Sequence, residues 1–173
     1  FPYTTLFRSL GHRNLLYLYE SFSSTLGFSS FNRISGFQEA CDAVDGLTAR
    51  TLAVQKGDSI LDAAISEIMA QDNPPTALCF HQDSQAIPLF FRLQRSGLSV
   101  PGDISVTGFD DSTFAKEAEL TTVRQRPYDM AVDAAQKALA LIEGQPIEEP
   151  FETFPVQLQV RNSTAKPRTA PLL

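Results

Sequence analysis

Hydrophobic positions in this chain alternate between short continuous runs and longer segments in which apolar residues recur every three or four positions. The short runs have the length and the β-branched or aromatic content of buried strands. They lie at residues 15–19, 51–54, 76–80 and 104–109, and extended pieces follow at 121–124 and 156–160. The pattern therefore predicts several short strands separated by helical segments.

The segments between these runs have the period of amphipathic helices. They lie at residues 31–44, from about 59 to 72, at 84–95 and at 127–143. In the third helix Ile87, Phe90 and Leu93 form the expected buried stripe, and Gly97 is expected to end it. Strands that alternate with helices at this spacing predict an α/β fold: a doubly wound, mostly parallel sheet flanked by helices.

The fourth apolar run ends in a polar sequence, Val106-Thr107-Gly108-Phe109-Asp110-Asp111. Ligands of open α/β sheets bind at the carboxyl ends of the strands. We therefore expect a site where Asp110 leaves its strand. Adjacent residues on an extended chain point in opposite directions, which argues against Asp110 and Asp111 as an acid–base pair.

Composition narrows the function classes. The chain has 173 residues, a net charge of −6 and no run of 18 apolar residues. The acidic balance argues against a nucleic-acid-binding surface, and no membrane span is expected. Cys41 and Cys79 stand alone in the sequence, which favours two reduced cysteines over a disulfide or a metal site. No catalytic motif is present, and we predict no enzyme activity, no cofactor and no metal.

The first nine residues differ from the rest. Residues 1–9 match the conceptual translation of a common sequencing-adapter oligonucleotide, and they lack the features of a signal peptide. We interpret them as a non-native scar, leave them out of the fold prediction, and expect the natural protein to extend upstream. The alternative is a genuine N-terminal strand.

Several ordered motifs resemble the effector-binding domain of LacI/GalR-family transcriptional regulators, whose fold is shared with periplasmic sugar-binding proteins. They are the Leu10–Arg13 sequence LGHR, Arg33 to Phe37 as R-x-x-G-F, Gly57-Asp58, Pro75 to Leu78 with Gln82-Asp83, and residues 101–125, which read PGDISVTGFDDS and then LTTVRQ. The resemblance runs from Leu10 to about Thr164, and several motifs in order are more specific than any one alone.

The resemblance implies a type I periplasmic-binding-protein-like fold, in which two subdomains face a cleft and the chain crosses between them three times. Residues 10–124 would form a nearly complete C-terminal subdomain, and 125–155 would belong to an N-terminal subdomain that is largely missing. Residues 156–164 would return as a strand, and 165–173 would be a loose tail. The helix at 127–143 would then lack its native partner, so we expect it to be less buried than its apolar face implies.

The resemblance also implies a site that binds a small effector through forked and planar polar side chains. The candidate residues are Arg33, Gln82, Asp83, Asp110 and Gln125, with Ser29 and Asp58 at its edge. Asp83 could equally be only the cap of the next helix.

Three residues depart from the family pattern or need a separate interpretation. Gln82 stands where the family usually has Asn, and its longer side chain puts the identity of the ligand in doubt. His81 is more typical of a structural or exposed histidine than of a ligand-binding one. Asp111 is expected to cap the turn that follows it, together with Ser112.

Three functions compete at this point. The first is the effector-binding and dimerisation domain of a cytoplasmic repressor, with a sugar or sugar derivative as effector and a homodimer formed through the C-terminal subdomain, including the helix with Ile87 and Phe90. Its DNA contact would come only from a missing N-terminal helix-turn-helix, and no membrane is involved. The second is a periplasmic sugar-binding protein of a transport system, and the third is an α/β enzyme.

Overall fold

A parallel sheet forms the centre of the molecule. The computed structural model describes residues 2–21, 28–55, 59–69 and 72–169. Four strands, β1 (Asn14–Ser21), β2 (Thr48–Gln55), β3 (Ala77–Phe80) and β4 (Ser105–Thr107), pair in the order β2-β1-β3-β4, and every pair is parallel. The predicted doubly wound α/β fold is confirmed.

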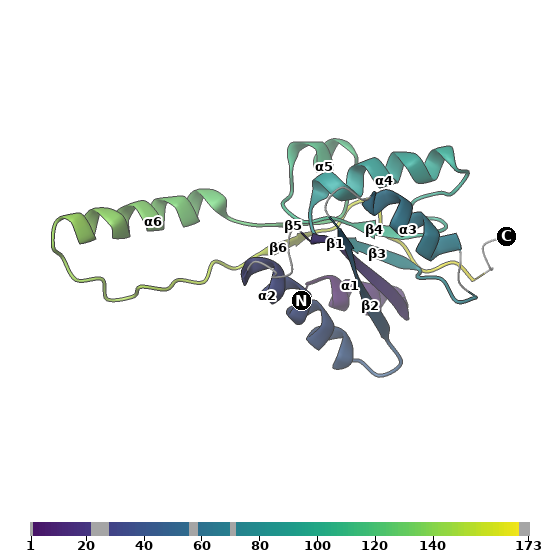
Figure 1. The fold of residues 1–173 in the computed structure, drawn as a ribbon, viewed down its shortest axis with the longest axis horizontal. Helices are drawn as coiled ribbons and strands as arrows, with labels where there is room; N and C mark the ends of the chain where they lie inside the picture. Colours follow the sequence, from purple (N-terminus) through teal and green to yellow (C-terminus); the bar gives the residue numbers. More distant parts are fainter. Residues whose placement is uncertain (1, 22–27, 56–58, 70–71, 170–173) are drawn as a thin grey trace.

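Helices cover both faces of this sheet (Figure 1). One face packs against α1 (Pro2–Leu10) and α2 (Phe28–Asp42), and the other packs against α3 (Ile60–Met69), α4 (Asp83–Arg95) and α5 (Thr113–Glu117). The Ser59 hydroxyl accepts a hydrogen bond from the Asp62 amide and caps α3.

Alternation along the central strand explains the two layers. In β1, Leu16 and Leu18 join the cluster beneath α3 and α4, whereas Leu15 and Tyr17 join the cluster beneath α1 and α2. All four side chains are almost fully buried. A strand that is buried on both faces needs apolar residues at consecutive positions, which is why its sequence reads as a continuous run.

A separate ribbon leads away from the sheet. Strands β5 (Thr122–Arg124) and β6 (Gln157–Gln159) pair antiparallel, and Thr121 bridges to Thr107 beside β4. Between β5 and β6 the chain forms α6 (Pro127–Ile142) and a long return segment. Figure 1 shows both projecting beyond the body, and we call residues 125–156 the arm.

The expected exposure of the last long helix is confirmed. Helix α6 has no buried residue, and Leu139 and Ile142 on its apolar positions are 55% and 82% exposed. The apolar pattern of α6 is therefore not used for packing within the described part of this chain.

Two predictions about the ends of the chain are wrong. Residues 1–9 were left out of the fold, yet α1 places Tyr3 and Phe7 in the second core cluster with no exposed surface. The tail was expected to be loose from residue 165. Instead, the Ala165 carbonyl lies 2.8 Å from Nε2 of His12, and Arg168 donates to the Asp103 carbonyl. Satisfied polar contacts, rather than apolar periodicity, hold this segment.

The predicted stripe of α4 also needs correction. The buried apolar residues are Ala86, Leu89 and Leu93, while Ile87 and Phe90 are only partly buried.

Among the described residues, no helix is both long and apolar enough to cross a membrane.

The contrast between α4 and α6 gives a stability test. Leu89→Ala should lower the free energy of unfolding by about 2–5 kcal/mol because it opens a cavity in the core. Leu139→Ala, on the exposed α6, should change it by less than about 0.5 kcal/mol. Urea unfolding followed by circular dichroism measures both, and similar losses in the two variants would contradict the exposed position of α6.

Candidate ligand-binding site

The candidate site lies where the direction of chain winding reverses. Strand β1 leads through α2 to β2 on one side, whereas β3 lies on the other side of β1 and leads to α4 on the opposite face. Such a switch point leaves an open crevice at the carboxyl ends of the strands. The structure brings Arg33, His81, Phe109 and Asp110 together there.

Arg33 is held in a fixed orientation. Its Nη1 atom donates to the carbonyl oxygen of His81 at 3.0 Å, and its guanidinium carbon lies 4.3 Å from the centre of the Phe109 ring. The stack and the hydrogen bond restrain a side chain that otherwise has many rotamers. The remaining guanidinium N–H groups have no acceptor among the residues that the structure describes.

Asp110 presents a carboxylate at the end of β4. Its side chain is exposed, and Oδ1 accepts a hydrogen bond from Nε2 of Gln125 at 2.8 Å. Partial desolvation raises the pKa of Asp110, and the Asp83 carboxylate adds to this, whereas Arg33 and Gln125 act in the opposite direction. Asp110 and Gln125 were predicted separately, and the structure brings them into contact.

The backbone at Asp110 is unusual. Its φ is 115°, and Asp111 next to it has φ 53°. L-residues avoid this region, and each such residue costs on the order of 1–3 kcal/mol. Strained residues of this kind cluster at functional sites, where the surrounding structure holds them in place.

Gly108 shows how tightly the turn is packed. A Cβ atom at this position would lie 2.2 Å from Oδ1 of Asp83 and 2.9 Å from Cδ2 of Leu120. The Tyr3 hydroxyl also donates to the Gly108 carbonyl oxygen. Only glycine therefore fits at position 108, where the turn after β4 packs against Asp83 in the turn after β3.

The Asp83 carboxylate supports the site through hydrogen bonds to neighbouring protein groups. Oδ1 accepts from the Thr122 hydroxyl at 2.6 Å, and Oδ2 accepts from the Ser112 amide at 2.8 Å. Burial raises the pKa of Asp83 in spite of these hydrogen bonds. The cap expected from Asp83 is wrong, because Asp83 is the first residue of α4 and Gln82 occupies the cap position without a side-chain cap.

The other predicted residues contribute less. The Gln82 side chain is exposed and accepts from the Ser84 hydroxyl at 3.3 Å. Ser29 lies in the first turn of α2, but its side chain is outside the described residues, and so is Asp58.

His81 has the structural role that the sequence analysis favoured over ligand binding. Its Nδ1 lies 2.9 Å from the Tyr17 hydroxyl, and Nε2 lies 3.3 Å from the Ser30 hydroxyl. Burial, followed by the charge of Arg33, lowers the pKa of His81 to about 4. A neutral His81 thus supports the loop whose carbonyl holds Arg33. Sequence analysis did miss Phe109 as a site residue, although its place before Asp110 was a usable signal.

Asp111 does not cap the turn as predicted. The Ser112 hydroxyl caps α5 alone, accepting from the Ala115 amide at 3.1 Å. The Asp111 carboxylate instead accepts from Arg124 and Arg161. Burial would raise the pKa of Asp111, but the hydrogen bonds and charges of these two arginines outweigh it, and the net shift is downward.

Comparisons with known proteins agree with this architecture. A family model described as a periplasmic binding protein-like domain matches residues 4–164. The HTH-type transcriptional regulator GalR of Escherichia coli is 32% identical over 162 residues, which are 91% of this chain and 46% of GalR. The arabinose metabolism transcriptional repressor of Geobacillus stearothermophilus is 40% identical over 97 residues, which are 54% of this chain and 27% of that protein.

A solved structure shows the same fold. A LacI family transcriptional regulator from Enterococcus faecium, with bound ribose, superposes with a TM-score of 0.80 at 24% identity, covering 96% of this chain and 62% of that one. The chain thus spans about half the length of GalR and under two thirds of this structure.

The environment of His81 predicts a pH dependence of stability. An unfolded histidine titrates near 6.5 and folded His81 at about 4, so the folded state binds fewer protons between these values. The free energy of unfolding should therefore fall as the pH is lowered from 6.5 to 4. His81→Gln should make this slope shallower, and the slope that remains should include His12, whose pKa burial also lowers.

Urea unfolding at several pH values between 7.5 and 4 measures the slope in both proteins. An identical slope in the parent and in His81→Gln would show that His81 is not held neutral in the folded state.

Proposed function

The chain belongs to the periplasmic binding protein-like domain family, within the LacI/GalR-family regulators, and we propose that it binds a sugar or a sugar derivative as the effector of a cytoplasmic repressor. The observation that carries the proposal is the meeting of Arg33, Asp110 and Gln125 at the switch point of the sheet. These groups offer several donors in a fixed geometry and a carboxylate that accepts from neighbouring hydroxyls.

The proposed ligand class has two further supports. The arabinose metabolism repressor is named for a sugar, and the Enterococcus faecium regulator was solved with ribose. In this chain the buried Phe109 ring lies beneath Arg33 and holds its guanidinium in place beside the Asp110 carboxylate. A ligand that left such a group unmatched would lose about 1–3 kcal/mol, which gives the site its selectivity.

The second function considered from the sequence, a periplasmic sugar-binding protein of a transport system, is not favoured. GalR and the arabinose metabolism repressor are both regulators of transcription. We propose that DNA contact in the whole protein is made by a helix-turn-helix outside this chain, and that effector binding changes the orientation of the arm relative to the sheet.

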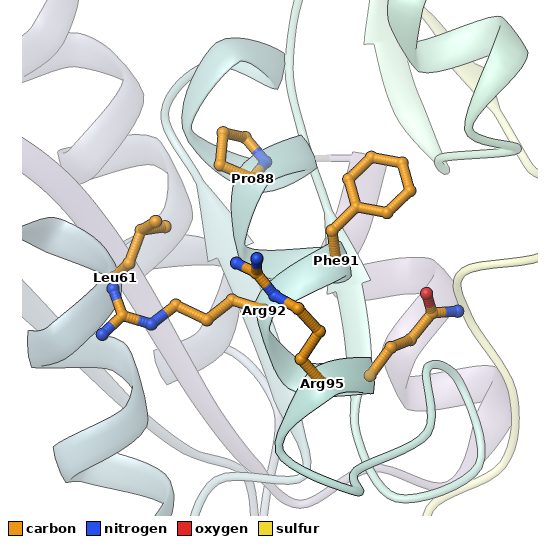
Figure 2. Close-up of a pocket in the computed structure, with 6 residues that line it drawn as sticks. Leu61, Pro88, Phe91, Arg92 and Arg95 are labelled. Carbon is orange, nitrogen blue, oxygen red and sulfur yellow. The ribbon is translucent and has the colours of Figure 1, made fainter.

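We also propose that the outer face of α4 forms a homodimer contact. Ile87 packs against the core, so the outward residues are Pro88 and Phe91 rather than Ile87 and Phe90. Figure 2 shows Phe91, Arg92 and Arg95 along α4, with Leu61 of α3 at the opposite side of the hollow that they line. Phe91 is 52% exposed and, with the exposed Pro88 beside it, presents apolar surface on this face of α4.

Ligand binding can be tested on the chain itself. In ¹H–¹⁵N spectra recorded with L-arabinose, D-galactose and D-ribose at up to about 100 mM, we expect shifts for at least one sugar around Arg33, Phe109 and Asp110. The high concentration allows for weak, millimolar binding, which corresponds to about −4 kcal/mol. Asp110→Asn and Arg33→Ala should weaken binding at least about tenfold, since each removes a charge-assisted hydrogen bond.

Asp45→Asn is the matched control, because Asp45 is also an exposed aspartate but lies in the turn before β2. No shift with any of the three sugars, or equal weakening by Asp45→Asn, would contradict the proposed site.

The dimer contact makes a separate prediction. The parent chain should sediment as a dimer at micromolar concentration, and Phe91→Glu should shift it to monomer because a charge would be buried at the contact. Phe114→Glu is the control, since Phe114 is 74% exposed but lies on α5. A parent chain that is monomeric at 100 µM would contradict the α4 contact.

A further inference from the structure

In the described part of the chain, the arm is connected to the body by the ribbon of β5 and β6 and by the hydrogen bond from Gln125 to Asp110 at its base. Residues 125–156 leave the body after Arg124 and return at Gln157, and Figure 1 shows α6 standing clear of the helices that cover the sheet. Whatever orients this ribbon therefore orients the arm and also Gln125, which stands at the base of the arm and reaches into the candidate site.

One buried carboxylate joins both strands of the ribbon to the end of β4. The Asp111 side chain is 2% exposed. Its Oδ2 atom accepts from Nε of Arg124 at 2.6 Å, and its Oδ1 atom accepts from Nη2 of Arg161. Arg124 is the last residue of β5, and Arg161 follows β6 by two residues. Lys116 lies further away, with Nζ at 3.9 Å from Oδ2.

Arg161 extends the connection to the start of the ribbon. Its Nη1 atom donates to the Leu120 carbonyl at 2.7 Å, and its backbone amide donates to the Thr121 hydroxyl at 3.0 Å. The side chain is only 14% exposed. Both partners of the Asp111–Arg161 pair are therefore largely withdrawn from water, and such a pair is costly to break because one charge is left buried.

The same two stretches of chain also meet at the candidate site. Asp110 and Asp111 are consecutive, and so are Arg124 and Gln125. The buried Asp111 binds Arg124, while the exposed Asp110 binds Gln125. Between these contacts the Asp110 amide donates to the Val123 carbonyl at 2.9 Å. A shift of Arg124 relative to Asp111 would therefore move Gln125 relative to Asp110.

We propose that Asp111 is the positioning residue of the ribbon: its ion pairs with Arg124 and Arg161 fix the direction of the arm and place Gln125 against Asp110. Asp111 itself does not face the ligand. Its effect on ligand affinity rests on the proposed function, whereas its effect on the arm does not.

The arm can be tested without any ligand. In ¹⁵N relaxation measurements on the parent chain, the amides of α6 should tumble with those of β1 and β3. In Asp111→Asn they should gain independent motion, and the amides of Asp110 and Arg161 should exchange with solvent at least about tenfold faster. The amides of Leu16 and Leu78, deep in the sheet, report global unfolding and should change by less than about twofold.

Two further variants separate positioning from folding. Arg124→Gln removes only the more exposed partner and leaves Arg161 on Asp111, so it should loosen the ribbon even if Asp111→Asn folds poorly. Asp133→Asn is the matched control, because it breaks the Asp133–Lys137 ion pair within the arm and touches no residue of the ribbon. It should leave the α6 tumbling and the Asp110 exchange unchanged.

Titration with L-arabinose and D-ribose tests the effect of the same variants on ligand binding. If a sugar binds the parent, Asp111→Asn and Arg124→Gln should weaken it about tenfold or more, and Asp133→Asn should not. If neither sugar binds the parent, the proposed function fails on these probes, but the relaxation data still decide the role of Asp111. An α6 that moves independently in the parent, or stays equally rigid in Asp111→Asn and Arg124→Gln, overturns the proposal.

Discussion

Burial of the parallel strands on both faces is the constraint from which the rest of the structure follows. Consecutive apolar residues in β1 and β3 serve the two helical layers in turn, so polar side chains are left for the strand ends. At the carboxyl ends the winding reverses, so α2 and α4 lie on opposite faces of the sheet, and ligands of open α/β sheets bind at such a point. Arg33 and Asp110 reach this edge from different elements because the sheet brings these elements together.

The site depends on a supporting set of buried polar contacts. Asp83 accepts from Thr122 and Ser112, so it holds the β3 turn against the ribbon and the β4 turn. His81 holds its loop between Tyr17 and Ser30, and the carbonyl of that loop orients Arg33. The left-handed backbone at Asp110 is tolerated because these contacts fix the turn on both sides.

The sequence predicted the layers of the fold well, for a physical reason. Periodicity reports burial, and burial decides the strand and helix order, so all four sheet strands and the exposed α6 were expected from pattern and resemblance. The hydrogen-bond partners of individual polar side chains were harder to predict. Asp83 and Asp111 look like caps in a linear sequence, yet their partners Thr122 and Arg161 lie 39 and 50 residues away.

The same limit explains the errors at the chain ends. Tyr3 and Phe7 fill the core whatever the origin of their sequence, because a helix with apolar residues four apart can cover one face of a sheet. Residues 163–168 have no apolar period, but they find donors and acceptors on His12, Ser105 and Asp103. Contacts between distant polar groups leave no periodic signal in the sequence.

A crystal structure of this chain grown with a bound monosaccharide tests the central claim most directly. We predict sugar hydroxyls within hydrogen-bonding distance of the Arg33 guanidinium and the Asp110 carboxylate, with Gln125 beside them at the base of the arm. A sugar bound elsewhere, for example in the hollow on α4, with Arg33 and Asp110 making no contact to it, would contradict the account.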